Sequence, residues 1–537
     1  MVSPSVGSLP SDAGRVPESV RSMPGRALKP SLVAAALLGA LLVFLALGRL
    51  GAGIGGMLQR GEATFGEAIL YDHAARIVRG ERLYQPPDRL PYTVAAYTPL
   101  YYAIAAALQA VFGPTFLPGR IVSLAAGIAA AALVGRLAWR RARSRLAGAF
   151  AAFLFLALGF PGRMPFFALY KEDMLGVALA LGAVATLAGG RSTRRLIVAG
   201  ALAALAILTK QTLIAAALSG TVCLLQEGRK RAALFVGVCL AIVAATAAAL
   251  EIATGAFLAN AFFANAVPFR RDALKENLES LRQFQTIPLA LAGLSVLDRW
   301  RRDRRPQADL LLLYWGACLL AIAGFARPGS AHNYWIELAA ATAVLATDAL
   351  WARLRRQETY ADRDLAFVLV LLLAAHVALR TRAFGSAAVP VRSLLQSLPK
   401  QDPDFGRLVE RVRSGKREVL ADPPDVVVLA GRRNLLELYF SSIRYSEGRL
   451  NLDPLVRKIC RGDVGLLAIR YKLDSDARGI YQGYPFWPQP VLAALRESMT
   501  FQAEQAGRFL YVPLDAAARA SRAADPSGVC HGAMPPR

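Results

Sequence analysis

Three consecutive ionisable residues open a hydrophobic run in the stretch ALYKEDMLGVALALGA. They are Lys171, Glu172 and Asp173, and charged groups beside hydrocarbon are expensive to keep unless an interface or a site uses them. Asp173 lies deepest in the run, so it is a candidate catalytic carboxylate. Lys171 is a candidate ligand for an anionic substrate, and the alternative is that it extends to lipid headgroups.

Two further acids lie in the stretch GEATFGEAILYDHAARIVRGERLYQ. Helical spacing places Glu67, Tyr71 and Ala74 on one face, with His73 to the side. A carboxylate just outside a membrane span can act as general base toward an acceptor hydroxyl or amine. Glu67 and Asp72 are therefore candidate catalytic residues. The alternative is a solvated helix beside the membrane.

Two cations have the surroundings of a phosphate site. Lys210 stands in the apolar sequence ILTKQTLI, and a buried lysine requires an anionic partner, which a lipid phosphate would supply. Arg327 offers a second contact with bidentate geometry. The nearby sequence HNYWIE adds Asn333, Tyr334 and Glu337 as candidate substrate-binding residues, although Asn333 could instead cap the following helix.

Aromatic residues gather in the sequence YTPLYY. Tyr97 and Tyr101 could line a groove for a sugar or an acceptor, or belong to an aromatic belt at the membrane interface. Motifs for other chemistry are missing from the sequence. It has no Walker A sequence, no glycine-rich dinucleotide turn after a strand, and no His/Cys cluster with zinc spacing.

The elements that must position these residues are membrane helices. The 537-residue chain is 55% hydrophobic, and long apolar runs recur from residue 31 to residue 380, which predicts a polytopic α-helical membrane protein. The formal net charge of +25 could suggest nucleic acid as a partner. We exclude nucleic acid because the arginines cluster in short loops between apolar runs, where orientation signals belong.

The basic loops define a topology. Five clusters, at 136–145, 189–195, 227–231, 298–305 and 351–357, lie on one side only if an even number of spans separates each from the next. This condition holds if the run 96–113 is interfacial or re-entrant rather than spanning. About eleven spans remain, and the candidate site residues fall on the opposite, outer side. The predicted spans are 31–50, 119–136, 146–160, 168–188, 195–208, 211–226, 232–252, 286–297, 309–325, 334–350 and 364–380.

The chain divides into four parts. We expect residues 1–30 to form a disordered cytoplasmic tail, 31–383 a transmembrane domain with an outer loop at 51–118, 384–515 a small extracytoplasmic α/β domain, and 516–537 a disordered tail. In the α/β domain, REVLADPPDVVVLAG, VGLLAIRY and GRFLYVP are expected to form strands, and DPLVRKICRG and QPVLAALRES helices. This domain carries no catalytic motif, and we interpret it as a lid or an acceptor-docking module. Cys460 and Cys530 could pair if it is extracytoplasmic.

These residues together resemble the GT-C superfamily of membrane glycosyltransferases, in particular the bacterial branch of protein O-mannosyltransferases and lipid A aminoarabinose transferases. Glu67 resembles the second acid of the family's first-loop pair, with Ala74 and Gly80 at matching distances. The run GRIVSLAAGIAAAALVGRLAWRR, which includes Arg120, resembles the next helix of the family. YKEDMLGVALAL resembles its basic-x-Asp motif, and HNYWIE its Asn-Tyr element. One position departs from the pattern, since Gly66 replaces the first acid of the pair.

The resemblance implies a GT-C-like fold and an activity. Such enzymes move a sugar from a polyprenyl-phosphate carrier to a lipid, glycan or protein acceptor on the outer face of the bacterial inner membrane. Glu67 or Asp72 would be the base, Lys171 would face the carrier phosphate with Arg120 among the substrate-binding residues, and Asp173 would shape the site. Membrane lipids are partners, and a divalent metal between two acids is compatible with the pattern. The alternatives are a polyprenyl-linked glycan polymerase or ligase, and a lipid or glycan transporter.

Overall fold

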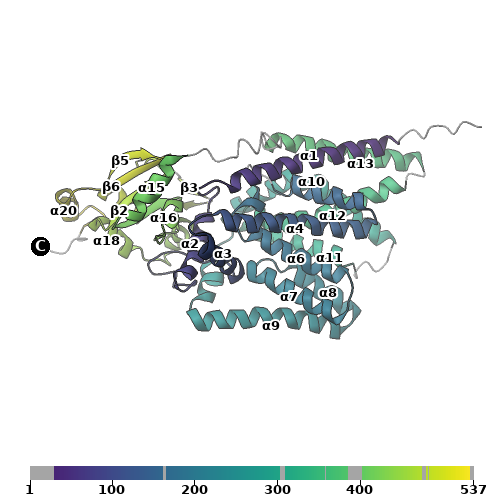
Figure 1. Cartoon of the computed structure of the whole chain (residues 1–537), viewed down its shortest axis with the longest axis horizontal. Helices are drawn as coiled ribbons and strands as arrows, with labels where there is room; N and C mark the ends of the chain where they lie inside the picture. The colour runs from purple at the N-terminus through teal and green to yellow at the C-terminus, as the bar shows by residue number, and fades with distance from the viewer. Residues whose placement is uncertain are drawn as a thin grey trace, which may run out of the picture.

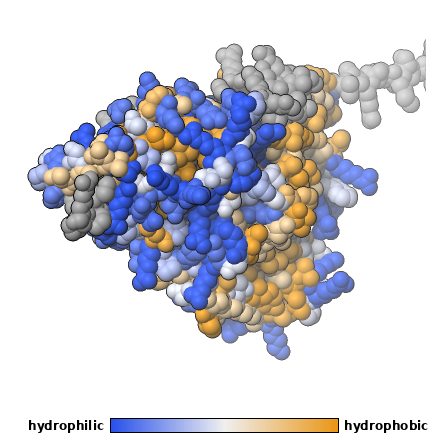
Figure 2. Space-filling model, turned by 60° about the vertical axis from the view of Figure 1, so that its left-hand side comes forward, coloured by the Kyte–Doolittle hydropathy of each residue, from blue (hydrophilic) through white to orange (hydrophobic). Residues whose placement is uncertain are grey.

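The computed structural model describes residues 29–160, 165–302, 309–356, 359–384, 402–474, 479–481 and 483–531. A bundle of helices makes up the first part, and a small α/β domain lies at one end of the bundle (Figure 1). On the face shown in Figure 2, hydrophobic residues gather over the bundle and hydrophilic residues over the α/β domain. This division is that of a chain whose helices face hydrocarbon and whose smaller domain faces water.

Each of the eleven predicted spans coincides with a helix. Among the described residues, α1, α4, α9 and the segment 332–355 are long and apolar enough to cross a membrane. The helix for the predicted span 286–297 begins earlier, at Arg271, because the polar sequence before the apolar part continues the same helix. The bundle helices are α1 (Pro30–Met57), α4 (Leu117–Ala142), α5 (Arg145–Leu158), α6 (Asp173–Ala188), α7 (Thr193–Thr209), α8 (Ala215–Glu227), α9 (Arg229–Thr254), α10 (Arg271–Arg302), α11 (Leu310–Leu320), α12 (Ile336–Arg355) and α13 (Tyr360–Phe384).

The basic clusters meet at one end of the bundle. Arg141 at the end of α4 forms ion pairs with both Asp309 and Asp348, at 2.7 and 2.8 Å. The other contacts between clusters are Arg353 with Asp298, Arg191 with Glu227, the indole of Trp351 with the hydroxyl of Ser144, and Arg140 beside Gly189. The five loops that the sequence analysis placed on one side therefore do lie together.

The outer loop forms two helices at the opposite end. Helices α2 (Glu67–Val78) and α3 (Pro99–Phe112) pack against each other, and Figure 1 shows them between the bundle and the α/β domain. Helix α3 has 14 residues, fewer than the ~20 that a span requires. The hydroxyl of Thr98 at its start donates to the carbonyl of Ile207 in α7 at 2.7 Å, which holds it against the outer end of the bundle.

The α/β domain is built on a four-stranded sheet. Strand β1 (Glu418–Asp422) is parallel to β2 (Val464–Ile469), and β6 (Arg508–Pro513) is antiparallel to both β2 and β5 (Met499–Gln505). Strands β3 (Ile480–Tyr481) and β4 (Tyr484–Pro485) form a separate hairpin. The helices of this domain are α15 (Pro403–Ser414), α16 (Asp425–Leu429), α17 (Leu438–Ser446), α18 (Asp453–Arg461), α19 (Gln489–Ser498) and α20 (Ala516–Ala524).

Two segments of this domain differ from the sequence-based expectation. The run DVVVL, expected to extend a strand, forms the short buried helix α16, because Pro423 and Pro424 lack the N–H groups that a central strand needs. The segment 516–524, expected to be disordered, forms helix α20. The side chain of Asp515 caps the N-terminus of this helix. The chain thus continues as part of the domain beyond residue 515.

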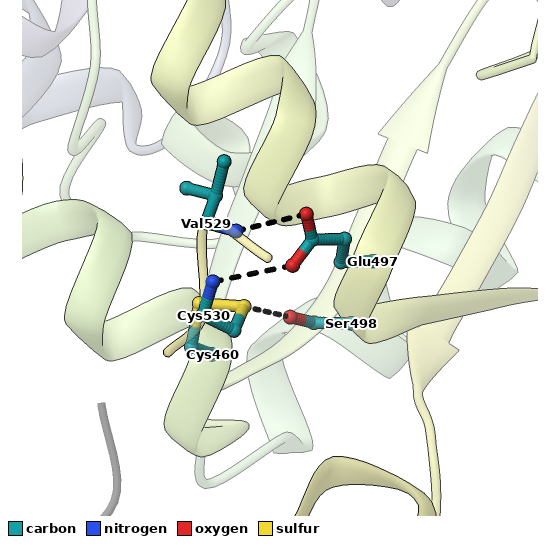
Figure 3. Close-up of a disulfide and its surroundings, with 5 residues drawn as sticks. All are labelled: Cys460, Glu497, Ser498, Val529 and Cys530. Carbon is teal, nitrogen blue, oxygen red and sulfur yellow. Dashed lines mark hydrogen bonds between the residues drawn. A yellow bond between two sulfur atoms is a disulfide. The ribbon is translucent and has the colours of Figure 1, made fainter. Parts of the chain in front are cut away.

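A disulfide joins Cys460 of α18 to Cys530 near the end of the described chain (Figure 3). The Glu497 carboxylate accepts the backbone N–H groups of Val529 and Cys530, and the Ser498 hydroxyl lies 3.1 Å from the Cys530 sulfur. Cys223, Cys239 and Cys318 are free and buried. The pairing that the sequence left open therefore forms.

Polar contacts join the α/β domain to the outer loop, and two of them involve the outer-loop backbone at Glu62 and Tyr92. Asp425 of α16 is fully buried, pairs with Arg508 at 2.7 Å, and accepts the backbone N–H of Glu62 at 3.0 Å. The backbone of Tyr92 donates to the carbonyl of Leu435 and accepts the N–H of Glu437, both at 2.9 Å. The second contact extends the outer loop alongside residues 435–437, and it brings Glu437 to the boundary between the domains.

Candidate functional site

A cavity of about 290 Å³ lies where the outer ends of the bundle helices, the outer loop and the α/β domain meet. Its volume is at the lower end of the range for small-molecule sites. Six of the sequence-predicted site residues line it, and they come from four separate parts of the chain: Tyr97, Lys171, Lys210, Arg327, Asn333 and Tyr334. The other six predicted residues do not line it: Glu67, Asp72, Arg120, Tyr101, Asp173 and Glu337.

Helix α2 presents one face to the cavity. Gly66, Ile69, Leu70 and His73 line it, and their spacing is that of one helix face. His73 is buried, and neither ring nitrogen has a hydrogen-bond partner among the described residues. The sequence had placed His73 to the side of the predicted catalytic face, but in the structure the helix is turned so that His73 faces the cavity.

Glu67 lies on the other face of α2 and forms a buried ion pair. Its carboxylate accepts from Arg120 at 2.9 and 2.8 Å and from the backbone N–H groups of Ala63 and Tyr170 at 2.7 and 2.6 Å. Both side chains are fully buried. With all these acceptor positions used, the pair fastens α2 to α4 and to the segment before α6.

Asp72 is also buried in ion pairs. Its carboxylate lies 3.6 Å from Arg76 and 3.4 Å from Arg79. Burial raises the pKa of Asp72, and the two guanidinium groups oppose this shift. The side chain thus holds the two arginines of its own helix turn, on a part of α2 that does not line the cavity.

Asp173 begins α6 and contacts the cavity through its partners. Its carboxylate pairs with the Lys210 ammonium and accepts from the Asn333 amide at 3.0 Å. The carboxylate of Glu172 lies 3.1 Å from the same ammonium. Lys210 also lies over the rings of Tyr97 and Tyr334, at 5.3 and 5.0 Å from their centroids. Predicted residues from four separate stretches of the chain therefore form one cluster, and the two acids orient the lysine that faces the cavity.

Two cavity-lining cations have no carboxylate partner among the described residues. Lys171 forms no ion pair within the described part of the chain, and the Arg327 guanidinium donates to the backbone and side-chain oxygens of Asn265, the latter at 2.9 Å. Gly66 makes room for Lys171, since its φ is +93° and a Cβ there would lie 2.5 Å from the Lys171 ammonium. Lys171 and Arg327 are thus available to an anion in the cavity.

Tyr101 and Glu337 serve the packing around the site. The Tyr101 hydroxyl donates to the carbonyl of Gly119 at 3.2 Å. The Glu337 carboxylate accepts from the Tyr314 hydroxyl at 2.9 Å inside the bundle. Both side chains are buried away from the cavity.

Sequence reasoning missed Glu437, which reaches the cavity from the α/β domain. Its Oε2 accepts the backbone N–H of Val94 at 2.9 Å. Burial raises the pKa of Glu437 to about 8, while Arg76 and Lys171 lower it and Asp72 raises it further. The domain shows no motif around this residue, so only its contact with the outer loop could have revealed it.

A smaller cavity of about 230 Å³ adjoins the first. Phe65 and Tyr439 line both cavities. The rest of the second lining is mainly apolar and comes from the α/β domain: Ser442, Ile443, Tyr484, Pro485 and Phe486.

The acids of the site do not form a metal centre. Among the described residues, no group of three or more His, Cys, Asp or Glu side chains could hold a metal ion. Glu67, Asp72 and Asp173 are each engaged with a cation of the protein instead. The donor set therefore does not fit the divalent metal that a first-loop pair of acids would hold.

Comparison with known proteins identifies the fold. Neither the protein-family models nor the curated proteins searched include a match. ArnT from Cupriavidus metallidurans bound to undecaprenyl phosphate is similar, with a TM-score of 0.54 and 14% sequence identity over 91% of this chain and 99% of that one. The apo structure of ArnT from the same organism has a TM-score of 0.54 and 13% sequence identity over 89% of this chain and 98% of that one.

The archaeal oligosaccharyltransferase AglB from Archaeoglobus fulgidus, in complex with an inhibitory peptide and a dolichol-phosphate, is also similar. Its TM-score is 0.50 at 14% identity, over 90% of this chain and 74% of that one. ArnT and AglB are both members of the GT-C superfamily. This chain therefore has the fold of the GT-C membrane glycosyltransferases.

Proposed function

We propose that this protein transfers a sugar from a polyprenyl-phosphate carrier to an envelope lipid, glycan or protein acceptor on the outer face of the bacterial inner membrane. The observation that carries the proposal is the cavity at the outer end of the bundle, with Lys171, Lys210 and Arg327 on its membrane-domain wall. The likeness to ArnT bound to undecaprenyl phosphate and to AglB with a dolichol-phosphate supports a lipid-phosphate donor.

The cations suit the charge change of such a transfer. When the bond between the sugar and the phosphate breaks, about one further negative charge develops on the phosphate. Lys210 is already balanced by Glu172 and Asp173, so Lys171 and Arg327 supply the charge that is free to respond. Fixed cations at a poorly hydrated site stabilise developing charge strongly, because they need little reorganisation.

The roles of the acids follow from their partners. Asp173 holds Lys210 and Asn333 in place, and Glu67 with Arg120 holds α2 against the bundle. Asp72 acts on Arg76 and Arg79. These acids are occupied by cations of the protein itself and not by a metal ion in the proposed reaction.

The disulfide supports the orientation of the chain. Disulfides persist in oxidising compartments outside the cytoplasm, and the Cys460–Cys530 pair lies in the α/β domain. That domain would then face outward together with the cavity, and the basic end of the bundle and the N-terminus would face the cytoplasm, as the positive-inside rule requires.

The test is the substitution Lys171→Ala in the full-length protein. Lys416→Ala is the matched control, because Lys416 is exposed on the α/β domain. Binding of undecaprenyl phosphate to the purified protein should weaken about tenfold or more in Lys171→Ala, since charge-assisted hydrogen bonds are worth about 1.5–3 kcal/mol. The control should bind like wild type.

Mass spectrometry of envelope lipids and glycans then compares a deletion strain rescued by wild type with one rescued by Lys171→Ala. We expect the variant to accumulate a polyprenyl-phosphate-linked sugar and to lose a sugar from one product. An accumulated carrier bearing a whole oligosaccharide would assign a glycan polymerase or ligase instead. The proposal fails if wild type neither binds undecaprenyl phosphate nor changes any envelope glycan.

A further inference from the structure

The cavity contains one carboxylic acid among the described residues, and it is Glu437. The three acids that the sequence suggested as catalytic residues all lie outside the lining, and each forms ion pairs with cations of the protein. Glu67 pairs with Arg120, Asp72 with Arg76 and Arg79, and Asp173 with Lys210. A group that exchanges a proton with substrate must come within hydrogen-bond reach of it. Of the acids, only Glu437 is placed to do so.

The backbone around Glu437 fixes its position. Residue 437 is hydrogen-bonded to Tyr92 of the outer loop, and its Oε2 accepts the N–H of Val94 at 2.9 Å. Oε1 has no protein donor among the described residues and belongs to a cavity-lining side chain. One oxygen therefore anchors the carboxylate while the other remains available to a substrate.

The cations and the carboxylate of the cavity come from different parts of the chain. Lys171, Lys210 and Arg327 belong to the membrane domain, whereas Glu437 belongs to the α/β domain. The wall that carries Glu437 continues through Tyr439 into the smaller apolar cavity. This arrangement favours the phosphate at the membrane-domain wall and an acceptor entering along the α/β domain.

Gly66 completes this division of roles. It lines the cavity at the start of α2 but has no side chain, and the Lys171 ammonium takes the space that a Cβ would need. The outer loop thus contributes the His73 imidazole to the cavity but no acid, and Lys171 comes from the segment before α6. A carboxylate has to come from another element, and Glu437 supplies it.

We propose that Glu437 is the catalytic base that removes the proton from the acceptor nucleophile, an inference that rests on the proposed function. The acceptor oxygen or nitrogen forms a bond to the anomeric carbon, and the bond from that carbon to the phosphate oxygen breaks. The electron pair of the broken bond leaves with the polyprenyl phosphate, and the acceptor proton passes to Glu437.

One carboxylate is sufficient for this reaction. A glycosidase needs a second carboxylic acid because its leaving group is an alkoxide that must be protonated. A phosphate leaves without protonation when cations stabilise it, and Lys171 and Arg327 line the same cavity as Glu437. A single displacement of this kind inverts the anomeric configuration.

The protonation behaviour of Glu437 agrees with this role. Burial is the main cause that raises the pKa of Glu437 to about 8. The hydrogen bond from Val94 and the charges of Arg76 and Lys171 lower this pKa, and the charge of Asp72 raises it. A base acts in its deprotonated form, so the transfer rate should rise as the pH increases toward 8 and then level off.

The experiment uses Glu437→Gln in the full-length protein, with Glu410→Gln as the control. Glutamine can still accept the Val94 N–H, so the contact with the outer loop is kept, and Glu410 is an exposed glutamate of the same domain with 63% of its side chain accessible. We expect Glu437→Gln to bind undecaprenyl phosphate like wild type. The glycosylated product of the rescued deletion strain should fall about 100-fold or more, the effect of losing a general base.

Three results would overturn the assignment or its basis, and they are distinguishable. Full product from Glu437→Gln shows that another group is the base, and His73→Gln then tests the remaining cavity-lining base. Loss of undecaprenyl-phosphate binding together with product assigns Glu437 a structural role. If wild type itself binds no undecaprenyl phosphate and alters no glycan, the proposed function fails and not this assignment alone.

Discussion

Three adjacent charged residues, Lys171, Glu172 and Asp173, have different environments although they are neighbours in sequence. Lys171 lines the cavity without an acidic partner, whereas the two acids hold Lys210. A buried charge without a partner is strongly destabilising, so the acids are needed to keep Lys210 charged at this depth. The cluster thus provides one oriented cation and one free cation.

At this scale the prediction concerns Glu67, the first-loop acid. We expect Glu67→Gln to destabilise the protein by about 3–5 kcal/mol, because it leaves the buried Arg120 guanidinium without a counter-charge. Thermal unfolding of the purified protein measures this effect. The folded fraction should retain transfer activity, since Glu67 does not line the cavity.

Arg120 provides the companion variant. Arg120→Met should destabilise the protein to a similar degree, because it leaves the Glu67 carboxylate unpaired. Normal stability with complete loss of activity in Glu67→Gln would instead identify Glu67 as the base and contradict the reading of its ion pair as structural.

The rotation of helix α2 determines which of its residues line the cavity. The spacing in the sequence correctly groups Glu67 with Tyr71 on one face, but that face packs toward α3, α4 and the segment before α6, as the Glu67–Arg120 pair and the Gln109 contact to the Tyr71 carbonyl show. The face with Gly66 and His73 is the one that lines the cavity. A helical pattern gives the angular relation between residues but not the rotation of the helix.

The disulfide gives the prediction at the level of elements. It closes a sequence separation of 70 residues between α18 and the segment after α20. The double substitution Cys460→Ser with Cys530→Ser should lower the stability of the α/β domain by about 2–5 kcal/mol. Thermal unfolding of the full-length protein measures the change.

Reduction of the wild-type protein provides the control for this prediction. The remaining cysteines are buried in the bundle, so dithiothreitol should reproduce the effect of the double substitution and add nothing to it. Equal unfolding temperatures for the oxidised wild type and the double variant would show that the bridge does not constrain the domain.

The whole molecule is organised by the two ends of the bundle. One end gathers the arginine clusters, and the other gathers the cavity, the outer loop and the α/β domain. In Figure 1 the sheet of the α/β domain lies at one end of the bundle, away from the opposite end of the helices. A substrate carried by a lipid and an acceptor approaching from water could therefore meet only at the second end.

This organisation predicts opposite accessibility at two exposed positions. Thr500→Cys, on β5, should react with a membrane-impermeant maleimide in intact spheroplasts. Ser192→Cys, in the basic loop before α7, should react only after permeabilisation. The native free cysteines are buried and give a low background. Labelling of Ser192→Cys in intact spheroplasts would reverse the orientation.

Much of the architecture could be predicted from the sequence. Long apolar runs determine helices because lipid leaves no other partner for the backbone. The parity of the arginine clusters then grouped five loops together, and the contacts between the clusters show that these loops lie at one end of the bundle. These signals are local or additive, so they can be read without knowledge of the packing. For the same reason, Lys171 and Arg327 could be recognised in the sequence as basic residues of loops away from the arginine clusters, and both line the cavity.

The tertiary structure alone decided which acid lines the cavity. Glu437 reaches the cavity through contacts with the outer loop, and its bond to Val94 joins residues 343 positions apart. No periodicity or motif encodes such a contact, because it depends on how two domains dock. Likewise, whether Glu67 faces the cavity or Arg120 depends on the rotation of α2, which the packing of its neighbours sets. The sequence therefore determined which loops gather at each end of the bundle, and the packing determined the residues that line the site.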